Sequence, residues 1–166
     1  MPGPSTWATV RAVDTTSEVA GRFGLGAPDQ ISFPVANVEE AAARYSQVFG
    51  PFDVFEVSMP DITFGGKPSE VTLKLGFAHC GPWEIELVEV VAGDHPATAH
   101  LAARGESIHH VRFPVGDLAT VQEEMEEAGF VTTFAGTSAG TAFAYLEAPQ
   151  ILGATSIELI QWPATA

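Results

Sequence analysis

The stretch SFPVANV at residues 32–38 returns, at an offset of 80, as RFPVGDL at residues 112–118. Both copies alternate apolar residues with others and then reach an Asn or Asp, at Asn37 and Asp117. Such alternation is typical of a half-buried strand, and Asn and Asp cap helices by accepting a hydrogen bond from a free amide of the first turn. We therefore predict a strand and then a helix in each copy, with the helices over residues 38–49 and 118–128.

A second pair of matching segments extends the repeat. IELV at residues 85–88 corresponds to IELI at residues 157–160, at an offset of 72. We assign the difference between the two offsets to a turn-rich insert at residues 61–68 of the first copy. Each copy then becomes a module that runs strand, helix, strand, strand, strand. The predicted strands lie near residues 29–35, 52–58, 70–78 and 83–91 in the first module, and near 108–115, 130–135, 141–147 and 154–161 in the second.

The length of 166 residues suits two small fused modules that share one core. The predicted class is α+β, with two tandem βαβββ modules. The predicted division is an N-terminal arm at 1–28, a first module at 29–94, a linking helix at 95–106 and a second module at 107–163.

The charge balance excludes several classes of partner. Acidic residues number 21 against 7 basic ones, which gives a net charge of −14. This field repels phosphate backbones and anionic lipid heads, so we expect neither nucleic acid nor membrane as a partner. A single cysteine, Cys80, allows no internal disulfide and no cysteine zinc cluster. With no basic, apolar leader at the N-terminus, we expect a cytoplasmic protein.

Strand parity places four polar residues on one face of the predicted sheet, away from the helices. They are Gln30, Glu86, His110 and Glu158, at equivalent positions of the two modules. An acid between large apolar residues is costly to bury without a partner, and one divalent cation would neutralise both carboxylates. Oxygen ligands with one imidazole suit Zn, Ni, Co, Mn or Fe. The alternative is that this face is solvated and the four residues are ordinary surface groups.

These segments resemble the vicinal oxygen chelate superfamily, which includes glyoxalase I, methylmalonyl-CoA epimerase, the bleomycin-resistance proteins and the extradiol dioxygenases. The resemblance covers residues 29–161, through DQISFPV at 29–35, IELV at 85–88, IHHVRFPV at 108–115 and SIELI at 156–160. It implies a half-open barrel of eight strands around a central cavity. It also implies a metal bound by Gln30, Glu86, His110 and Glu158. Eukaryotic glyoxalase I is similar in this order of ligands, whereas epimerases usually have His at the first position.

The resemblance further implies a metal-dependent isomerase or lyase of the glyoxalase I or epimerase kind, acting on a small carbonyl compound. Glu158 or Glu86 would then move the proton next to the carbonyl, and Glu70 is the candidate for a second catalytic acid on the epimerase pattern. Arg112 and Arg104 are the candidates for substrate binding. We also expect a homodimer.

Two other functions stay open at this point. One is a metal-free binding protein of the bleomycin-resistance type, which sequesters a drug or metabolite. The other is a metal-dependent dioxygenase or tailoring enzyme. Among the remaining histidines, His109 is expected to be structural, and His95 and His100 are expected at the surface of the linking helix.

Overall fold

The structure is a computed structural model that describes residues 21–164. The first module contains β1 (Gln30–Pro34), α1 (Val38–Phe49), β2 (Asp53–Phe64), β3 (Lys67–Cys80) and β4 (Trp83–Gly93). The linking helix is α2 (Pro96–Arg104). The second module contains β5 (His110–Pro114), α3 (Leu118–Glu127), β6 (Val131–Ser138), β7 (Thr141–Glu147), the short α4 (Pro149–Leu152) and β8 (Ser156–Gln161).

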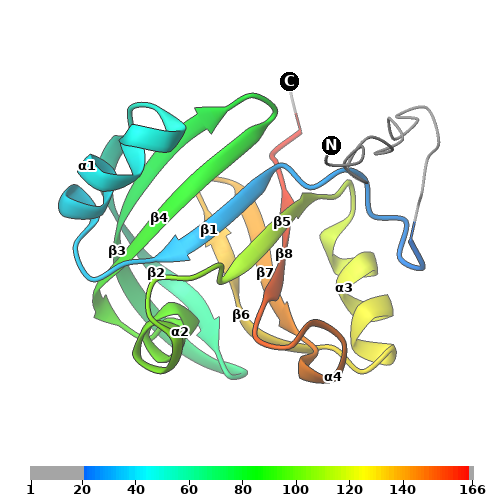
Figure 1. The fold of residues 1–166 in the computed structure, drawn as a ribbon. Coiled ribbons are helices and arrows are strands. Elements are labelled where there is room, and N and C mark those ends of the chain that lie inside the picture. The colour runs from blue at the N-terminus through cyan, green and yellow to red at the C-terminus, as the bar shows by residue number, and fades with distance from the viewer. Residues whose placement is uncertain (1–20, 165–166) are drawn as a thin grey trace, which may run out of the picture.

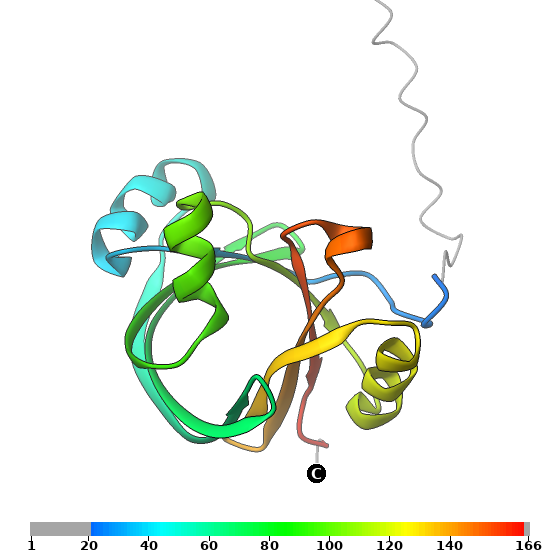
Figure 2. The ribbon, with the colours of Figure 1, turned by 90° about the horizontal axis from the view of Figure 1, so that it is seen from below.

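The eight strands form one ring in the order β1-β4-β3-β2-β6-β7-β8-β5 (Figures 1 and 2). Each module supplies four neighbouring strands, and the modules meet at two short antiparallel pairings. In one of them β1 pairs with β5, where Ser32 lies opposite His110, and in the other β2 pairs with β6 through residues 62–64. The α+β class and the curved eight-stranded sheet are thereby confirmed, and these two pairings close the sheet further than the half-open form that the resemblance implied.

The two long helices cover the outside of the ring, one on each module (Figure 2). On α1, Val38 and Ala41 are buried against Leu87 of β4. On α3, Met125 packs against Leu159 of β8, the repeat equivalent of Leu87. Burial of these outward strand residues leaves their immediate neighbours, Glu86 and Glu158, facing the inside of the barrel.

Both predicted helix caps form. The Asn37 side chain accepts from the amide of Glu40, and the Asp117 side chain accepts from the amide of Thr120. The first helical amides also have partners from the last strand of each module, because Val38 N–H donates to Glu89 and Leu118 N–H donates to Gln161, both at 2.8 Å. The sequence pattern had predicted the caps but not these cross-element bonds.

The predicted turn-rich insert at residues 61–68 is wrong in its extent. Strands β2 and β3 continue through it and are joined by Gly65 and Gly66, with φ values of 56° and 75°. Two consecutive residues with positive φ make the tight turn that matches the twist of a hairpin, and glycine adopts them without steric cost. The extra residues therefore lengthen a hairpin.

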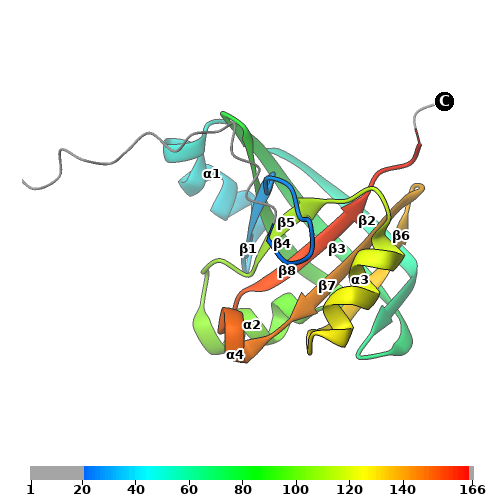
Figure 3. The same cartoon turned by 90° about the vertical axis from the view of Figure 1, so that its right-hand side faces the viewer.

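Helices α2 and α4 lie at the same end of the barrel (Figures 1 and 3). Most of the predicted N-terminal arm lies outside the described residues, but Phe23 and Leu25 pack against the second-module core. No helix within residues 21–164 is both long and apolar enough to cross a membrane.

Candidate functional site

The structure brings Gln30, Glu86, His110 and Glu158 together inside the barrel, from β1, β4, β5 and β8. Their exposed fractions are 1%, 7%, 0% and 7%, so they are not residues of a solvated sheet face. The parallel register of β1 with β4 and of β5 with β8 places the four strands side by side. The short β1–β5 pairing then joins the two halves of the group.

The side chains converge on the Nε2 atom of His110. Glu158 Oε2 lies 3.1 Å from it, Glu86 Oε2 lies at 3.3 Å and Gln30 Oε1 lies at 3.2 Å. Burial alone would lower the pKa of His110, but the carboxylates of Glu158 and Glu86 outweigh it and raise this pKa to about 9. In this arrangement His110 is an imidazolium that donates to the surrounding oxygens.

His109 holds the other side of the His110 ring. The two Nδ1 atoms lie 3.0 Å apart, so one must donate to the other. Burial and the neighbouring His110 lower the pKa of His109 to about 2, which makes His109 the neutral acceptor. This bond directs Nε2 of His110 toward the two carboxylates. His109 is itself buried, and its hydrogen bond holds the ring of His110 in place.

Gln30 is oriented by a chain of charged neighbours. Its Nε2 donates to Glu84 at 2.7 Å, which turns the amide oxygen toward His110. Glu84 also pairs with Arg112 at 3.1 Å, and Arg112 donates two hydrogen bonds to Asp29 at 2.8 and 3.1 Å. Arg112 is therefore at the site, as predicted from sequence, but its charge is already matched by two carboxylates.

The two candidate bases differ in their surroundings. Burial raises the pKa of Glu158 above its ordinary value. Burial also acts on Glu86, but the hydrogen bond and charge of His110 lower its pKa overall. Of the two, Glu158 is thus the acid that holds a proton more readily.

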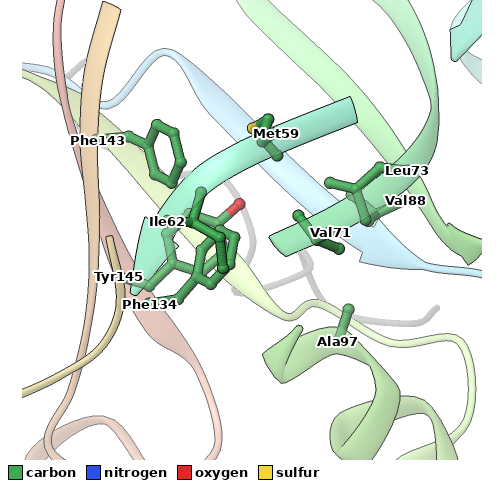
Figure 4. Packing of buried hydrophobic residues seen from close by; sticks show 9 residues of the cluster. All are labelled: Met59, Ile62, Val71, Leu73, Val88, Ala97, Phe134, Phe143 and Tyr145. Carbon is green, nitrogen blue, oxygen red and sulfur yellow. The ribbon is translucent and has the colours of Figure 1, made fainter. Parts of the chain in front are cut away.

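Glu86 and Glu158 of this group line a cavity of about 310 Å³ inside the barrel, together with Glu84 and Arg112. Most of the lining is apolar, and aromatic side chains come from both modules. The aromatic members are Phe55, Phe77, Phe134, Phe143, Tyr145 and Trp162. Figure 4 shows Phe134, Phe143 and Tyr145 gathered with Met59, Leu73 and Val88 inside the barrel.

Two predicted site residues lie away from both the group around His110 and the cavity. Glu70 of β3 is exposed and lies beside a separate surface depression with Ser58 and Gly93. Arg104 is exposed at the last turn of α2. Glu70 does not reach the cavity because it lies near the start of the long β3, beyond the segment of that strand that lines the cavity.

His95 was expected at the surface, and this expectation is wrong. It is 3% exposed, lines the cavity and packs against Phe134 with ring centroids 4.5 Å apart. Its Nδ1 accepts from Ala97 N–H as the cap of α2, and its Nε2 has no hydrogen-bond partner.

Tyr145, whose pKa is raised by burial and by Glu158 and Glu86, is a further cavity residue that the sequence pattern did not single out.

The donor set fits a divalent cation. It offers two carboxylates, one imidazole and one amide oxygen, and the buried Glu86 Oε2 has His110 Nε2, at 3.3 Å, as its charged neighbour. In this structure the oxygens surround the His110 nitrogen, and within residues 21–164 no three His, Cys, Asp or Glu side chains already surround a common metal position. A cation would have to replace the proton of His110.

The sequence matches a protein family over most of this fold. The profile described as Glyoxalase/Bleomycin resistance protein/Dioxygenase superfamily matches residues 29–145. The chain therefore belongs to this superfamily, as the sequence resemblance predicted. None of the curated proteins matches the sequence significantly.

Solved structures share the fold at low identity. A hypothetical protein from Bacillus halodurans is 22% identical with a TM-score of 0.62, and the match covers 84% of this chain and 96% of that one. Methylmalonyl-CoA epimerase from Mycobacterium tuberculosis is 19% identical with a TM-score of 0.58, covering 85% and 90%. A variant epimerase from Streptomyces coelicolor, in complex with 2-nitronate-propionyl-CoA, is 19% identical with a TM-score of 0.60, covering 84% and 99%.

Proposed function

We propose that this chain is a metal-dependent isomerase or lyase that moves a proton at the carbon next to a carbonyl of a small substrate. The observation that supports it is the buried group around His110, in which Glu86, Glu158 and Gln30 lie within 3.3 Å of one imidazole nitrogen. Gln30, Glu86, His110 and Glu158 would hold the divalent ion. When bound, that ion acts as a Lewis acid and stabilises the negative charge that develops on a carbonyl oxygen.

The residues have separate roles in this proposal. Glu158 is the preferred base, because it lines the cavity and, in the metal-free chain, burial raises its pKa above the ordinary value. Glu86, with its lower pKa, stays ionised and holds charge at the site. The apolar walls exclude water from the reacting carbon. Glu70 is outside the cavity, so we do not assign it the second proton transfer.

Isotope exchange tests the proposal directly. The metal-loaded protein is incubated in D2O with a panel of hydroxy-carbonyl and thioester compounds, and deuterium at the carbon next to the carbonyl is followed by NMR. We expect exchange with at least one compound, and Glu158→Gln should reduce it by about 10²–10⁴-fold while leaving the fold intact. Glu123→Gln, on the solvent side of α3, is the matched control. Absence of exchange across the panel with Zn, Ni, Co, Mn and Fe would contradict the proposal.

A second candidate function is a metal-free small-molecule binding protein. The ion pairs of His110 with Glu86 and Glu158 favour it, because they compensate the buried charges without a cation. Metal titration separates the two candidates. One ion bound per chain, lost in His110→Gln, supports the enzyme, whereas no binding up to millimolar metal supports the binding protein.

A further inference from the structure

We propose that the cavity takes an aromatic ligand that carries no negative charge. As an assignment of substrate this rests on the proposed function, but as an assignment of ligand it stands on the cavity itself. It separates this chain from the epimerase neighbours, one of which is in complex with a coenzyme A compound.

The cavity offers an anionic ligand no cation that is free of a carboxylate partner within the described residues. Within residues 21–164, Arg112 is the one Lys or Arg that lines the cavity. Its guanidinium already donates to Asp29 and pairs with Glu84. A phosphate or carboxylate placed there would have to displace a protein carboxylate, and it would meet the repulsion of the remaining acids.

The charges at and next to the cavity wall are mostly acidic. Glu84, Glu86 and Glu158 line the cavity, and Asp29 lies next to it as an ion-pair partner of Arg112. These four carboxyl groups stand against the positive charges of Arg112 and His110. With the four carboxyl groups ionised, the balance stays negative when a divalent cation replaces the His110 proton, because Arg112 and the cation together supply only three positive charges. In a low-dielectric cavity such a field disfavours an anion more strongly than it would in water.

Two aromatic side chains of the cavity lining are exposed to solvent. Phe55 is 47% exposed and Trp162 is 51% exposed, although both line the cavity. Phe55 stacks on Phe77 with ring centroids 5.5 Å apart, and Arg112 lies over the Trp162 ring at 5.3 Å. These exposed rings line the same cavity as the buried Phe134 and Phe143, which Figure 4 shows, and together they fit a flat apolar ligand.

Two fluorescent probes that share one skeleton test whether a negative charge weakens binding. N-phenyl-1-naphthylamine is uncharged, and 8-anilinonaphthalene-1-sulfonate is the same skeleton with a sulfonate. Fluorescence titration should give a Kd at least about tenfold lower for the uncharged probe, and acetyl-CoA should not displace it. Equal or tighter binding of the sulfonate, or displacement by acetyl-CoA, would overturn the proposal.

Three variants place the binding in the cavity. Phe55→Ser should weaken the uncharged probe several-fold, whereas Ile151→Ser, at a still more exposed apolar position on α4, should leave it unchanged. Asp29→Asn removes a negative charge and one of the two acceptors of Arg112, so the sulfonated probe should gain affinity relative to the uncharged one. If Ile151→Ser weakens the probe as much as Phe55→Ser, the probe binds elsewhere and the assignment fails. Because these measurements need no turnover, their outcome is independent of the isotope-exchange test.

Discussion

At the scale of single residues, a proton and a metal cation compete for Nε2 of His110 in the candidate site. The carboxylates that raise the pKa of His110 to about 9 are the same groups proposed to hold the metal. Metal affinity should therefore rise by about tenfold per pH unit between pH 7 and 9, as His110 loses its proton. Isothermal titration at several pH values measures this slope. An affinity that stays constant over this range would show that His110 is not a ligand.

His95 gives a pH effect of the same sign, but on stability. Burial and the charge of His110 lower its pKa from 6.5 to about 3, so it is neutral in the folded chain but protonated in the unfolded chain at mildly acidic pH. Its contribution is present above pH 6.5 and is lost as the pH falls from there toward 3. From pH 7 to 5 the free energy of unfolding should fall by about 2 kcal/mol from this group.

Denaturant unfolding of His95→Asn across this range measures that contribution. Asparagine keeps a side-chain acceptor for the cap of α2 but does not titrate, so the variant should show a shallower loss of stability on acidification. At pH 7 its stability should be lower than that of the parent chain, because the ring contact with Phe134 is lost. A slope equal to that of the parent chain would contradict the assigned pKa.

The residue scale also shows what the sequence could predict about the site. Strand parity correctly selected Gln30, Glu86, His110 and Glu158 as neighbours, because alternation fixes the face of a strand residue. It could not find His95, whose burial follows from the way α2 closes on the barrel, or Glu84 as the group that orients Gln30. Those contacts depend on the three-dimensional path of the linker and on register between distant strands.

At the scale of elements, the repeat predicted the order of strands and helices well because each module repeats its apolar alternation. The length of β2 and β3 was missed, since a glycine pair within residues 61–68 is typical both of a loop and of a tight hairpin. The partners of the first helical amides, Glu89 and Gln161, are three residues beyond Glu86 and Glu158. This correspondence extends the repeat, although the two residue types differ.

The join between β4 and α2 makes a prediction at this scale. Gly93 has a φ of 84°, and an added Cβ would lie 2.1 Å from the carbonyl oxygen of Glu70. Gly93→Ala should therefore lower the free energy of unfolding by at least about 1–3 kcal/mol, from backbone strain and a steric clash with β3. Gly116→Ala is the control, since its Cβ would meet no atom within 4 Å and its φ is not positive. Thermal denaturation of both variants measures these losses. Equal losses of stability in Gly93→Ala and Gly116→Ala would contradict the prediction.

At the scale of the whole molecule, the charge and the cavity point in the same direction. The net charge of −14 was read from the sequence as excluding nucleic acids, and the cavity wall repeats this acidic balance locally. The largest buried apolar cluster lines the cavity, and the helix contacts form two other clusters on the outside of the ring. Each module therefore has an apolar cluster of its own between helix and strands, separate from the residues that line the cavity.

The last prediction concerns assembly. Gln30, Glu86, His110 and Glu158 meet within one chain, because the β1–β5 pairing joins the two modules of the same molecule. A homodimer, which the sequence predicted, is thus not required to complete the site. We expect sedimentation velocity to show a dimer at micromolar concentration, and we expect metal stoichiometry to stay at about one ion per chain when dilution gives monomers. The β1–β5 contact persists in each monomer, so the ligands keep their places. Loss of metal in step with dissociation would show instead that a partner chain supplies part of the site.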